Sequence, residues 1–488
     1  METTLHAAAS TASFTPARPL RVGLPGTLDV LDPRKAVDYV SGLVLDQIFD
    51  APYAATAGDS AAPLLFEPLR SEDSKSGLRF SAAVRPGVVF SDGTPLTAEI
   101  AAASLRGANV LAGKTTVDVR GDRVWFTLSS PNSRFDLTLA QSSCAIVLEK
   151  GAQLFGTGPY MFEEPPSLRL VQRTPRLRLI RNPHHHGTAN AREIEFHILR
   201  PEADGAPRSL VEAFLAGTVD VTTALSAADL ATWKIPGAVP VIKPSNSTAF
   251  LFMNTTRRPL DTAAARKAIA ATIDLLEIAS KAYERNPAAF VATTALPPAM
   301  SRGGGVARTS TAEGARLIEA SGLRGARLTL IVPWTPRPYL SKPGAIAEII
   351  RKRLADAGVS ISLVETKTSD EYFQYLATGR FDLALGGWIA DTADPADYFE
   401  ALLSSHAIGN ATFANYARWT SPATDALLAR FRVDPSDENR REIERVIAEE
   451  VPFVPLVHGQ SSAVHTRRVR NVTVTATGSM SLASVVVT

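Results

Sequence analysis

Two carboxylates come directly after an uncharged run in the second half of the sequence. Residues 383–389 read Leu-Ala-Leu-Gly-Gly-Trp-Ile, and Asp391 and Asp394 follow them. A run of this kind is typical of a strand buried inside a sheet, and ligands of open α/β sheets bind beyond the carboxyl ends of the strands. A carboxylate at this position is suited to ligand recognition, so Asp391 is the first candidate for a binding residue.

The same segment also allows a structural interpretation of its acidic residues. Asp-Thr-Ala-Asp-Pro is a sequence that forms turns, so a helix N-cap or turn role for Asp391 stays open. For Asp394, which precedes Pro395, a turn role is expected. Gly386 and Gly387 are unusual inside a strand and indicate that a ligand or another backbone comes close there.

The other residues with ligand or nucleophile chemistry give no second site. His184, His185 and His186 are consecutive, and adjacent side chains on a turn rarely converge on one ion. No metal site is therefore predicted, and metal binding by this run stays an open alternative. Cys144 is the only cysteine, which excludes an intrachain disulfide, and its apolar neighbours indicate a buried, inert thiol. No cofactor is expected.

Known catalytic motifs are absent from the sequence. It contains no G-x-S-x-G, H-E-x-x-H, S-x-x-K, Walker A or G-x-G-x-x-G pattern. No catalytic residue is therefore named, and a protein that is not an enzyme is expected.

Composition and charge narrow the class of protein. The chain has 488 residues, of which 45% are hydrophobic and 20% charged, as in ordinary globular proteins of two or three domains. A formal net charge of +2 does not favour nucleic acid as a partner. No apolar stretch reaches the roughly 18 residues of a membrane-spanning helix, so stable membrane insertion is not expected. Residues 1–17 lack the basic and apolar regions of a secretory signal and are expected to form a disordered tail.

The elements that must position Asp391 alternate between strand and helix. The predicted elements are strands at 327–332, 359–364 and 383–389, and helices at 343–358 and 369–379. This β-α-β-α-β order predicts a parallel sheet with helices on its faces. Asp391 then lies at the carboxyl end of the third strand.

Other segments predict elements outside this unit. A helix is expected at 261–280, with Asp261 as its N-cap and with Ile269, Ile273 and Leu276 on its buried face. It follows a strand at 248–253 that ends at Asn254. The remaining expected elements are a helix at 436–450, a proline-broken extended stretch at 451–457, strands at 20–24, 88–90 and 124–128, a half-buried basic strand within 169–181, and a flexible loop at 303–305.

Four separated motifs resemble those of one family. The motifs are Phe-Ser-Asp-Gly-Thr-Pro-Leu-Thr-Ala-Glu at 90–99, similar to F-x-D-G-x-P-L-T-A-x-D; Gly-Thr-Gly-Pro-Tyr-Met-Phe at 156–162, similar to G-T-G-P-Y-x-F; Arg-Asn-Pro-His-His-His-Gly at 181–187, similar to R-N-P-x-Y-W-G; and the segment 381–395, similar to Y-D-L-x-x-x-G-W-x-A-D-Y-x-D-P. All four resemble the extracellular solute-binding proteins of ABC transporters, in the dipeptide, oligopeptide and nickel class. One motif alone would be weak, but four in the family's order, across residues 19–488, make the resemblance specific.

The resemblance implies an α/β fold of two lobes with a ligand cleft between them. A small α+β domain would be inserted in the first lobe. On this sequence the implied division is a first lobe from 18–45, 155–243 and 456–488, an extra domain at 46–154, and a second lobe at 244–455.

The resemblance also implies where a ligand would bind. In peptide-binding members the aspartate that matches Asp391 pairs with the ligand's α-amino group, which suits the need of a buried ammonium for a charged partner. The strand before it would pair with the ligand backbone, as would the segment that ends at Leu31. Trp388 would form a wall of the pocket. The implied ligand-binding set is Asp391, Trp388, Gly387, Gly386, Leu31 and Asn254.

The expected function is the capture of a small peptide or an amine-bearing, peptide-like ligand. A monomer in the periplasm or cell envelope would deliver this ligand to the permease subunits of an ABC transporter. Two alternatives stay open. Because no secretory signal is visible, a cytoplasmic protein of the same fold could sequester a peptide-like metabolite, and an enzyme could be built on the same cleft. A transcriptional regulator is not expected, because no residues remain for a helix-turn-helix.

Overall fold

The computed structural model of the chain describes most of its 488 residues. Asp391, the predicted loop at 303–305 and the predicted disordered tail at 1–17 lie outside the described residues. The described residues are 18–36, 38–56, 60–73, 76–164, 167, 176–199, 208–225, 227–283, 287–301, 311–333, 337, 339–390, 392–409 and 414–488.

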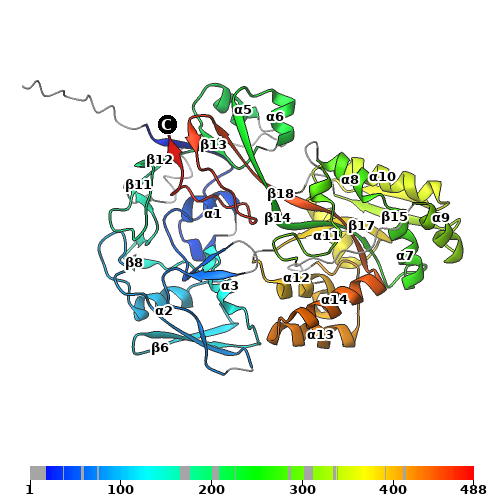
Figure 1. The fold of residues 1–488 in the computed structure, drawn as a ribbon, viewed down its shortest axis with the longest axis horizontal. Helices are drawn as coiled ribbons and strands as arrows, with labels where there is room; N and C mark the ends of the chain where they lie inside the picture. Colours follow the sequence, from blue (N-terminus) through cyan, green and yellow to red (C-terminus); the bar gives the residue numbers. More distant parts are fainter. Residues whose placement is uncertain are drawn as a thin grey trace, which may run out of the picture.

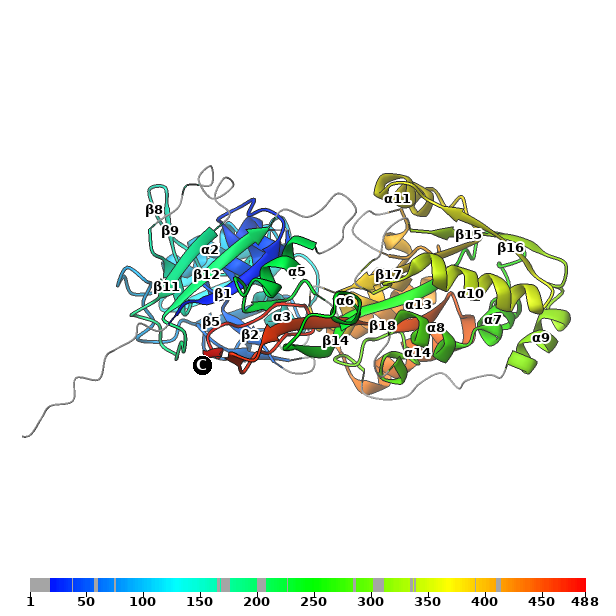
Figure 2. The same cartoon turned by 90° about the horizontal axis from the view of Figure 1, so that it is seen from above.

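One ten-stranded sheet runs through both lobes of the molecule (Figure 1). Two of its strands, β14 and β18, pair antiparallel from Ala238↔Thr466 to Phe252↔Phe453. They form the narrow connection between the lobes that Figure 2 shows from above. From one edge to the other, the strands are β10 (Tyr160–Phe162), β11 (Arg176–Arg181), β12 (Glu193–Leu199), β1 (Leu20–Pro25), β13 (Val221–Thr222), β18 (Phe453–Thr466), β14 (Ala238–Met253), β17 (Leu383–Ile389), β15 (Arg327–Val332) and β16 (Ser360–Glu365).

The predicted β-α-β-α-β unit is confirmed in the second lobe. β15, α10 (Pro343–Asp356), β16, α11 (Ser369–Thr378) and β17 follow one another, and β15 pairs in parallel with both β16 and β17. α10 buries Ile346, Ile350 and Leu354 in the core of this lobe, as their helical spacing predicts. The sheet as a whole is mixed, because β17 pairs antiparallel with β14 on its other side.

The single helix predicted at 261–280 is wrong. The segment forms α7 (Ala263–Thr272), whose N-cap is Thr262 rather than Asp261, and then α8 (Leu275–Ala282). Asp274 starts the second helix, because its carboxylate accepts hydrogen bonds from two amides of the next turn at 3.0 Å. Leu276 is consequently 45% exposed instead of buried.

Three strand predictions also need correction. The strand predicted at 248–253 is only the end of the 16-residue β14, and the extended stretch at 451–457 continues as the 14-residue β18. Pro455 does not end β18, because the register shifts beside it, between Ala249 and Phe250 of β14. Residues 88–90 contain an isolated bridge between Val89 and Pro95 in place of a strand.

The extra domain has a four-stranded antiparallel sheet of its own. In Figure 1 it lies at the lower left, beneath the first lobe. Its apolar side chains, among them Phe66, Phe90 and Phe126, form a core that is separate from the cores of the two lobes. The boundaries given above for the lobes and this domain stay a prediction. Its elements are β4 (Arg70–Ser71), β5 (Arg79–Ala83), β7 (Arg123–Leu128), β6 (Thr115–Arg120), α2 (Ala98–Arg106), α3 (Phe135–Leu139), and the hairpins β2 (Tyr53–Ala55) with β3 (Ala61–Pro63) and β8 (Leu148–Lys150) with β9 (Gln153–Phe155).

Further helices complete the two lobes. Among the described residues, no helix is long and apolar enough to cross a membrane. The first lobe has α1 (Tyr39–Leu45), α5 (Arg208–Leu215), α6 (Ala227–Trp233), the short η1 (Pro33–Lys35) and the strand pair β19 (Val469–Arg470) and β20 (Val486–Val487), and η2 (Ser142–Cys144) precedes β8. The second lobe has η3 (Pro287–Phe290), α9 (Thr311–Ala320), α12 (Pro395–Leu403), η4 (Ser405–Ala407), α13 (Pro422–Val433) and α14 (Asp437–Glu450).

Candidate ligand-binding site

β17 offers an unpaired backbone edge at the end that leads to Asp391. On one side it pairs with β14 over its whole length, from Leu383↔Met253 to Ile389↔Ser247. On the other side β15 pairs only with Leu383 and Ala384, so residues 385–389 have no strand neighbour there among the described strands. Alternate N–H and C=O groups of this stretch point away from β14, and those not already bound by the hydroxyls of Tyr372 or Tyr398 can pair with an extended ligand backbone.

Aromatic rings pack against the two glycines of β17. A Cβ on Gly386 would lie 2.8 Å from the hydroxyl of Tyr372, and a Cβ on Gly387 would lie 2.6 Å from the ring of Tyr339. The sequence predicted that a ligand or a second backbone comes close to these glycines. At Gly387 this is confirmed, because a Cβ there would also lie 2.6 Å from the backbone carbonyl oxygen of Thr248, whereas Gly386 is crowded by aromatic side chains. A ligand contact at this point would therefore use the backbone edge of the strand.

Four tyrosines form an aromatic wall beside this edge: Tyr339, Tyr372, Tyr398 and Tyr416. The hydroxyl of Tyr372 donates to the carbonyl of Leu385 at 2.8 Å. Burial raises the pKa of all four phenols, that of Tyr339 to about 12, so the hydroxyls stay neutral. Tyr372 and Tyr398 are only 1% and 0% exposed, so they support the strand from inside, and the half-buried Tyr339 and Tyr416 are the members that a ligand could contact.

Three buried polar atoms around β17 lack a hydrogen-bond partner within the described part of the chain. They are the indole nitrogen of Trp388, the side-chain oxygen of Asn246 and Nε of Arg337. Asn246 is next to the end of the strand, since its carbonyl accepts from the amide of Ala390 at 2.9 Å. Buried polar atoms are normally satisfied, so this concentration is the pattern of a site that a ligand completes.

Arg337 is the residue of this site that the sequence interpretation missed. Its guanidinium carbon lies 5.6 Å from the ring centroids of Tyr372 and Phe373, and the group is 3.4 Å from the hydroxyl of Ser369. No carboxylate of the described residues forms an ion pair with it. One available signal was its position, because it follows the carboxyl end of β15, at the same edge of the sheet as Asp391.

The residues after Asp391 form a fixed turn. The hydroxyl of Thr392 donates to Asp397 at 2.8 Å and accepts from the amide of Asp394 at 3.1 Å. Asp394 is buried and is the N-cap of α12, where its carboxylate accepts from the amide of Ala396 at 2.9 Å. The turn role predicted for Asp394 is confirmed, and this helix needs no cap from Asp391.

Asn254 does not fit the ligand-binding role that the resemblance implied. It is fully buried, and its amide nitrogen donates to the carbonyls of Gly379 and Phe381 at 2.9 and 3.0 Å. Its oxygen accepts from the hydroxyl of Thr256 at 2.7 Å. Because β14 and β17 are antiparallel, Asn254 lies at the start of β17, opposite to the end that leads to Asp391. We therefore leave it out of the candidate site.

Leu31 lies in the first lobe, in the loop after β1. It is half-buried and packs with Val30 on the core of that lobe. The amides of Asp29 and Val30 are 3.1 and 3.4 Å from the hydroxyl of Ser41, which ties the loop to α1. A ligand contact by Leu31 stays a proposal.

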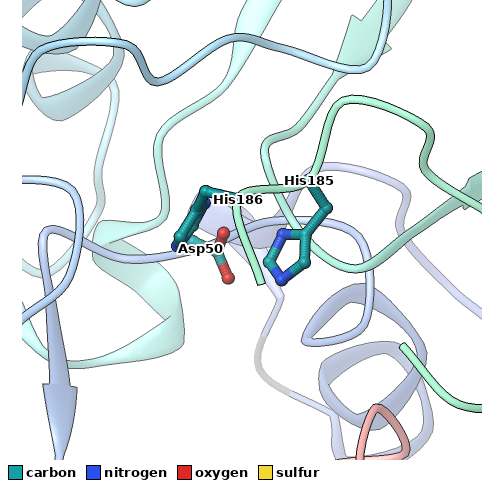
Figure 3. A group of neighbouring side chains, drawn as sticks. All are labelled: Asp50, His185 and His186. Atoms are coloured by element: carbon teal, nitrogen blue, oxygen red, sulfur yellow. The ribbon is translucent and has the colours of Figure 1, made fainter. Parts of the chain in front are cut away.

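One group of side chains, at the junction of the first lobe and the extra domain, could hold a metal ion. Asp50, His185 and His186 each place a ligand atom within 4.8 Å of the others (Figure 3). His184 does not belong to this group. The sequence interpretation found no metal site here because the third ligand comes from a segment more than a hundred residues away. Cys144 is buried, and burial raises the pKa of its thiol to about 12, as expected of an inert thiol.

A profile of the bacterial extracellular solute-binding proteins, family 5, middle part, matches residues 62–410. The chain belongs to this family. A structure of HbpA2 from Haemophilus parasuis has a TM-score of 0.84, covers 96% of this chain and 100% of its own, and is 22% identical in sequence. The expected α/β fold with two lobes is thereby confirmed.

Two curated relatives share this membership. The peptide transport periplasmic protein SapA of Salmonella typhimurium is 24% identical over 394 residues, which are 76% of this chain and 69% of that protein. The probable ABC transporter periplasmic-binding protein SapA of Escherichia coli is 26% identical over 255 residues, 50% of this chain and 45% of that protein. The chain thus matches between about half and two thirds of the length of these relatives.

Proposed function

We propose that this protein binds a short peptide between its two lobes and delivers it to the permease of an ABC transporter. The observation that carries the proposal is the edge of β17 at residues 385–389, which has no strand neighbour among the described residues and is followed in the sequence by Asp391. Membership of the family and the name of the Salmonella typhimurium relative, a peptide transport protein, support the same substrate class.

In this proposal Asp391 pairs with the ammonium of the peptide. Its described neighbours Ala390 and Thr392 are only 3% and 7% exposed. A shielded ammonium needs a charged partner. A carboxylate placed just beyond the strand supplies one, and it also fixes the direction in which the peptide lies along the edge.

The guanidinium of Arg337 is the proposed partner for the carboxylate at the other end of the peptide. It is half-buried between aromatic rings, and its Nε lacks a partner among the described residues. A planar guanidinium can bind a carboxylate through two parallel hydrogen bonds. The guanidinium of Arg337 and the carboxylate of Asp391 would bind the two ends of the ligand. This favours a short peptide with both termini free.

The backbone of the peptide would pair with β17. Pairing with a strand edge supplies affinity without reading side chains. The proposal therefore covers a class of short peptides and no single sequence. The rings of Tyr339 and Trp388 would contact the ligand side chains.

The proposal also covers where the protein is located in the cell and its oligomeric state. We propose that the protein acts outside the cytoplasmic membrane as a monomer, as the periplasmic names of the relatives suggest. No observation on the described residues favours the enzymatic or the cytoplasmic alternative. Fractionation of cells that express the native gene, followed by immunoblotting, checks the location.

Titration calorimetry with a peptide panel tests the function. The panel contains free amino acids, dipeptides, tripeptides and hexapeptides with free termini, together with N-acetylated and C-amidated versions of the tripeptides. We expect one binding site, the tightest binding for two- or three-residue peptides, and at least tenfold weaker binding after either terminus is blocked.

Two outcomes would contradict this proposal. One is the absence of saturable binding by every peptide, with a non-peptide molecule found in native mass spectra of freshly purified protein. The other is chromatographic detection of cleaved peptide after incubation, which would support the enzymatic alternative. Quantitative recovery of intact peptide is the expected result.

A further inference from the structure

A second polar cluster lies where the chain enters and leaves the extra domain. Asp50 lies near the start of that domain, and His185 and His186 lie on the loop after β11 in the first lobe. Their ligand atoms are within 4.8 Å of one another, and the two imidazole centroids are 4.5 Å apart. In the view of Figure 3 the carboxylate of Asp50 lies between the two rings. Two imidazoles and one carboxylate are a common ligand set for divalent transition metals.

Thr157 orients two of these three side chains. It is fully buried, and its hydroxyl donates to Oδ2 of Asp50 at 3.0 Å. Its carbonyl oxygen lies 2.9 Å from Nδ1 of His185. A proton on Nδ1 makes this second hydrogen bond and leaves Nε2 as the nitrogen that can bind a metal. Metal-binding histidines almost always have such a partner on the other ring nitrogen.

The loop that carries the histidines is fixed by Asn182, which is buried. Its side-chain oxygen accepts from the amide of His184 at 2.9 Å, and its side-chain nitrogen donates to the carbonyl of Gly158 at 2.8 Å. The histidine loop is therefore tied to the turn that contains Thr157.

The turn that contains Thr157 is also bonded to the segment before Asp50. The amide of Gly158 donates to the carbonyl of Ile48 at 2.9 Å. A Cβ on Gly158 would lie only 2.6 Å from the carbonyl carbon of Ile48, so the two backbones are in close contact. The three segments that carry Asp50, Thr157 and the histidines therefore form one unit.

We propose that Asp50, His185 and His186 bind a divalent transition-metal ion of the Zn²⁺ type, and that the ion fixes the extra domain to the first lobe. Bonds of about 2.0–2.2 Å place neighbouring ligand atoms roughly 3–3.5 Å apart. Side-chain shifts of about 1–2 Å are enough to reach this geometry from the observed one. Mg²⁺ and Ca²⁺ are excluded as preferred ions because they select oxygen ligands.

The proposed metal site does not depend on peptide binding. Its ligands lie in the first lobe and at the start of the extra domain, whereas β17 belongs to the second lobe. A metal at this position would join the start of the extra domain to the loop after β11 in the first lobe, so its main effect is on the stability of that junction.

Calorimetric titration of EDTA-treated protein without a histidine tag tests this proposal. ZnCl₂ is the titrant, and MgCl₂ is the comparison. We expect one Zn²⁺ per chain with a micromolar or lower Kd, a higher melting temperature with Zn²⁺ than with EDTA, and no saturable binding of Mg²⁺. When Co²⁺ replaces Zn²⁺, the protein should show a visible absorption band that is typical of cobalt bound by nitrogen ligands.

Single variants separate a metal site from a polar cluster. His185→Ala, His186→Ala and Asp50→Asn should each weaken Zn²⁺ binding at least tenfold, whereas the matched control His184→Ala should keep wild-type binding. His186 is exposed, so its removal leaves folding intact, which circular dichroism in EDTA would check. Absence of one-to-one binding, an equal loss in His184→Ala, or unchanged binding in His186→Ala would overturn the proposal and leave only a hydrogen-bonded cluster.

Discussion

Side chains near β17 divide into those whose polar atoms are paired inside the chain and those whose polar atoms are not. Asn254, Thr392 and Asp394 are paired, and they hold loops and helix ends. Trp388 and Arg337 each have a buried nitrogen without a partner among the residues that the structure describes. An unpaired buried polar atom costs about 1–3 kcal/mol, which a ligand can recover, so Trp388 and Arg337 are the binding candidates among these residues.

His458 gives a prediction about acid stability. It is 4% exposed on β18, its Nδ1 lies 3.0 Å from the hydroxyl of Thr248, and burial lowers its pKa to about 4. Because the unfolded chain takes up this proton near pH 6.5 and the folded chain only near pH 4, stability falls as pH decreases between these values. We expect His458 to contribute about 3 kcal/mol to that loss, measured by urea unfolding at several pH values.

The matched variants for this experiment are His458→Asn and His406→Asn. His458→Asn should flatten the decrease between pH 6.5 and 4, since an amide does not titrate there. His406 is exposed, so its replacement should leave the profile as in the wild type. An identical slope in the wild type and in His458→Asn would show that other groups cause the loss.

At the scale of elements, α12 and α13 are held together by one arginine. Arg432, near the end of α13, contacts three carboxylates of α12 and its cap: Asp394 at 3.4 Å, Asp397 at 2.6 Å and Glu400 at 2.9 Å. Burial opposes its charge, but the hydrogen bonds to Glu400 and the other carboxylates raise the pKa of Arg432. This pairing fixes the helix that begins four residues after Asp391.

Replacement of Arg432 by methionine should destabilise the second lobe. Three carboxylates would be left close together without their cation, so we expect the free energy of unfolding to fall by about 3 kcal/mol. Arg445→Met is the control, because Arg445 is 64% exposed and pairs with an exposed glutamate, and a change below about 0.5 kcal/mol is expected. Equal effects of the two changes in urea unfolding would refute the assigned role of Arg432.

Elements with a regular apolar period could be predicted from the sequence, and elements with buried polar runs could not. The spacing of apolar residues was enough for α10 and for the order β15–β16–β17. The lengths of β14 and β18 were missed because prolines and the polar residues 245–248 resemble a loop. In the structure these polar residues are buried, and some pair with one another, as Ser245 does with Ser247 at 2.6 Å.

The same limit applies to the candidate site. Gly386, Gly387 and Asp391 could be proposed because they lie within one short segment of the sequence. Arg337 comes from another segment, and it is connected to β17 through Tyr372, which a sequence pattern does not show. The metal cluster joins Asp50 to histidines at 185 and 186, so it could be seen only after the chain had folded.

At the scale of the whole molecule, the strands β14 and β18 are the main connection between the lobes (Figure 2). The register of their pairing is interrupted between Pro244 and Thr248, which gives a place where the lobes can bend. The extra domain also touches the second lobe, since the hydroxyl of Ser133 donates to the carbonyl of Arg432 at 3.0 Å. Closure of the lobes around a ligand would therefore be guided from two sides.

Small-angle X-ray scattering checks this closure. If a bound peptide contacts both lobes, its addition should reduce the radius of gyration. An N-acetylated peptide at the same concentration should cause a smaller reduction, because it binds less well. A radius of gyration that is unchanged at saturating peptide would mean that binding does not bring the lobes together.

The central claim is that Asp391 receives the amino end of a peptide that lies along β17. The most direct measurement is calorimetric binding of the best tripeptide, free and N-acetylated, to the wild type and to Asp391→Asn. We expect Asp391→Asn to weaken binding of the free tripeptide by about 3 kcal/mol, roughly 100-fold or more. Acetylation should have a similar effect on the wild type and little additional effect on the variant. Wild-type affinity of Asp391→Asn for the free tripeptide would contradict the claim.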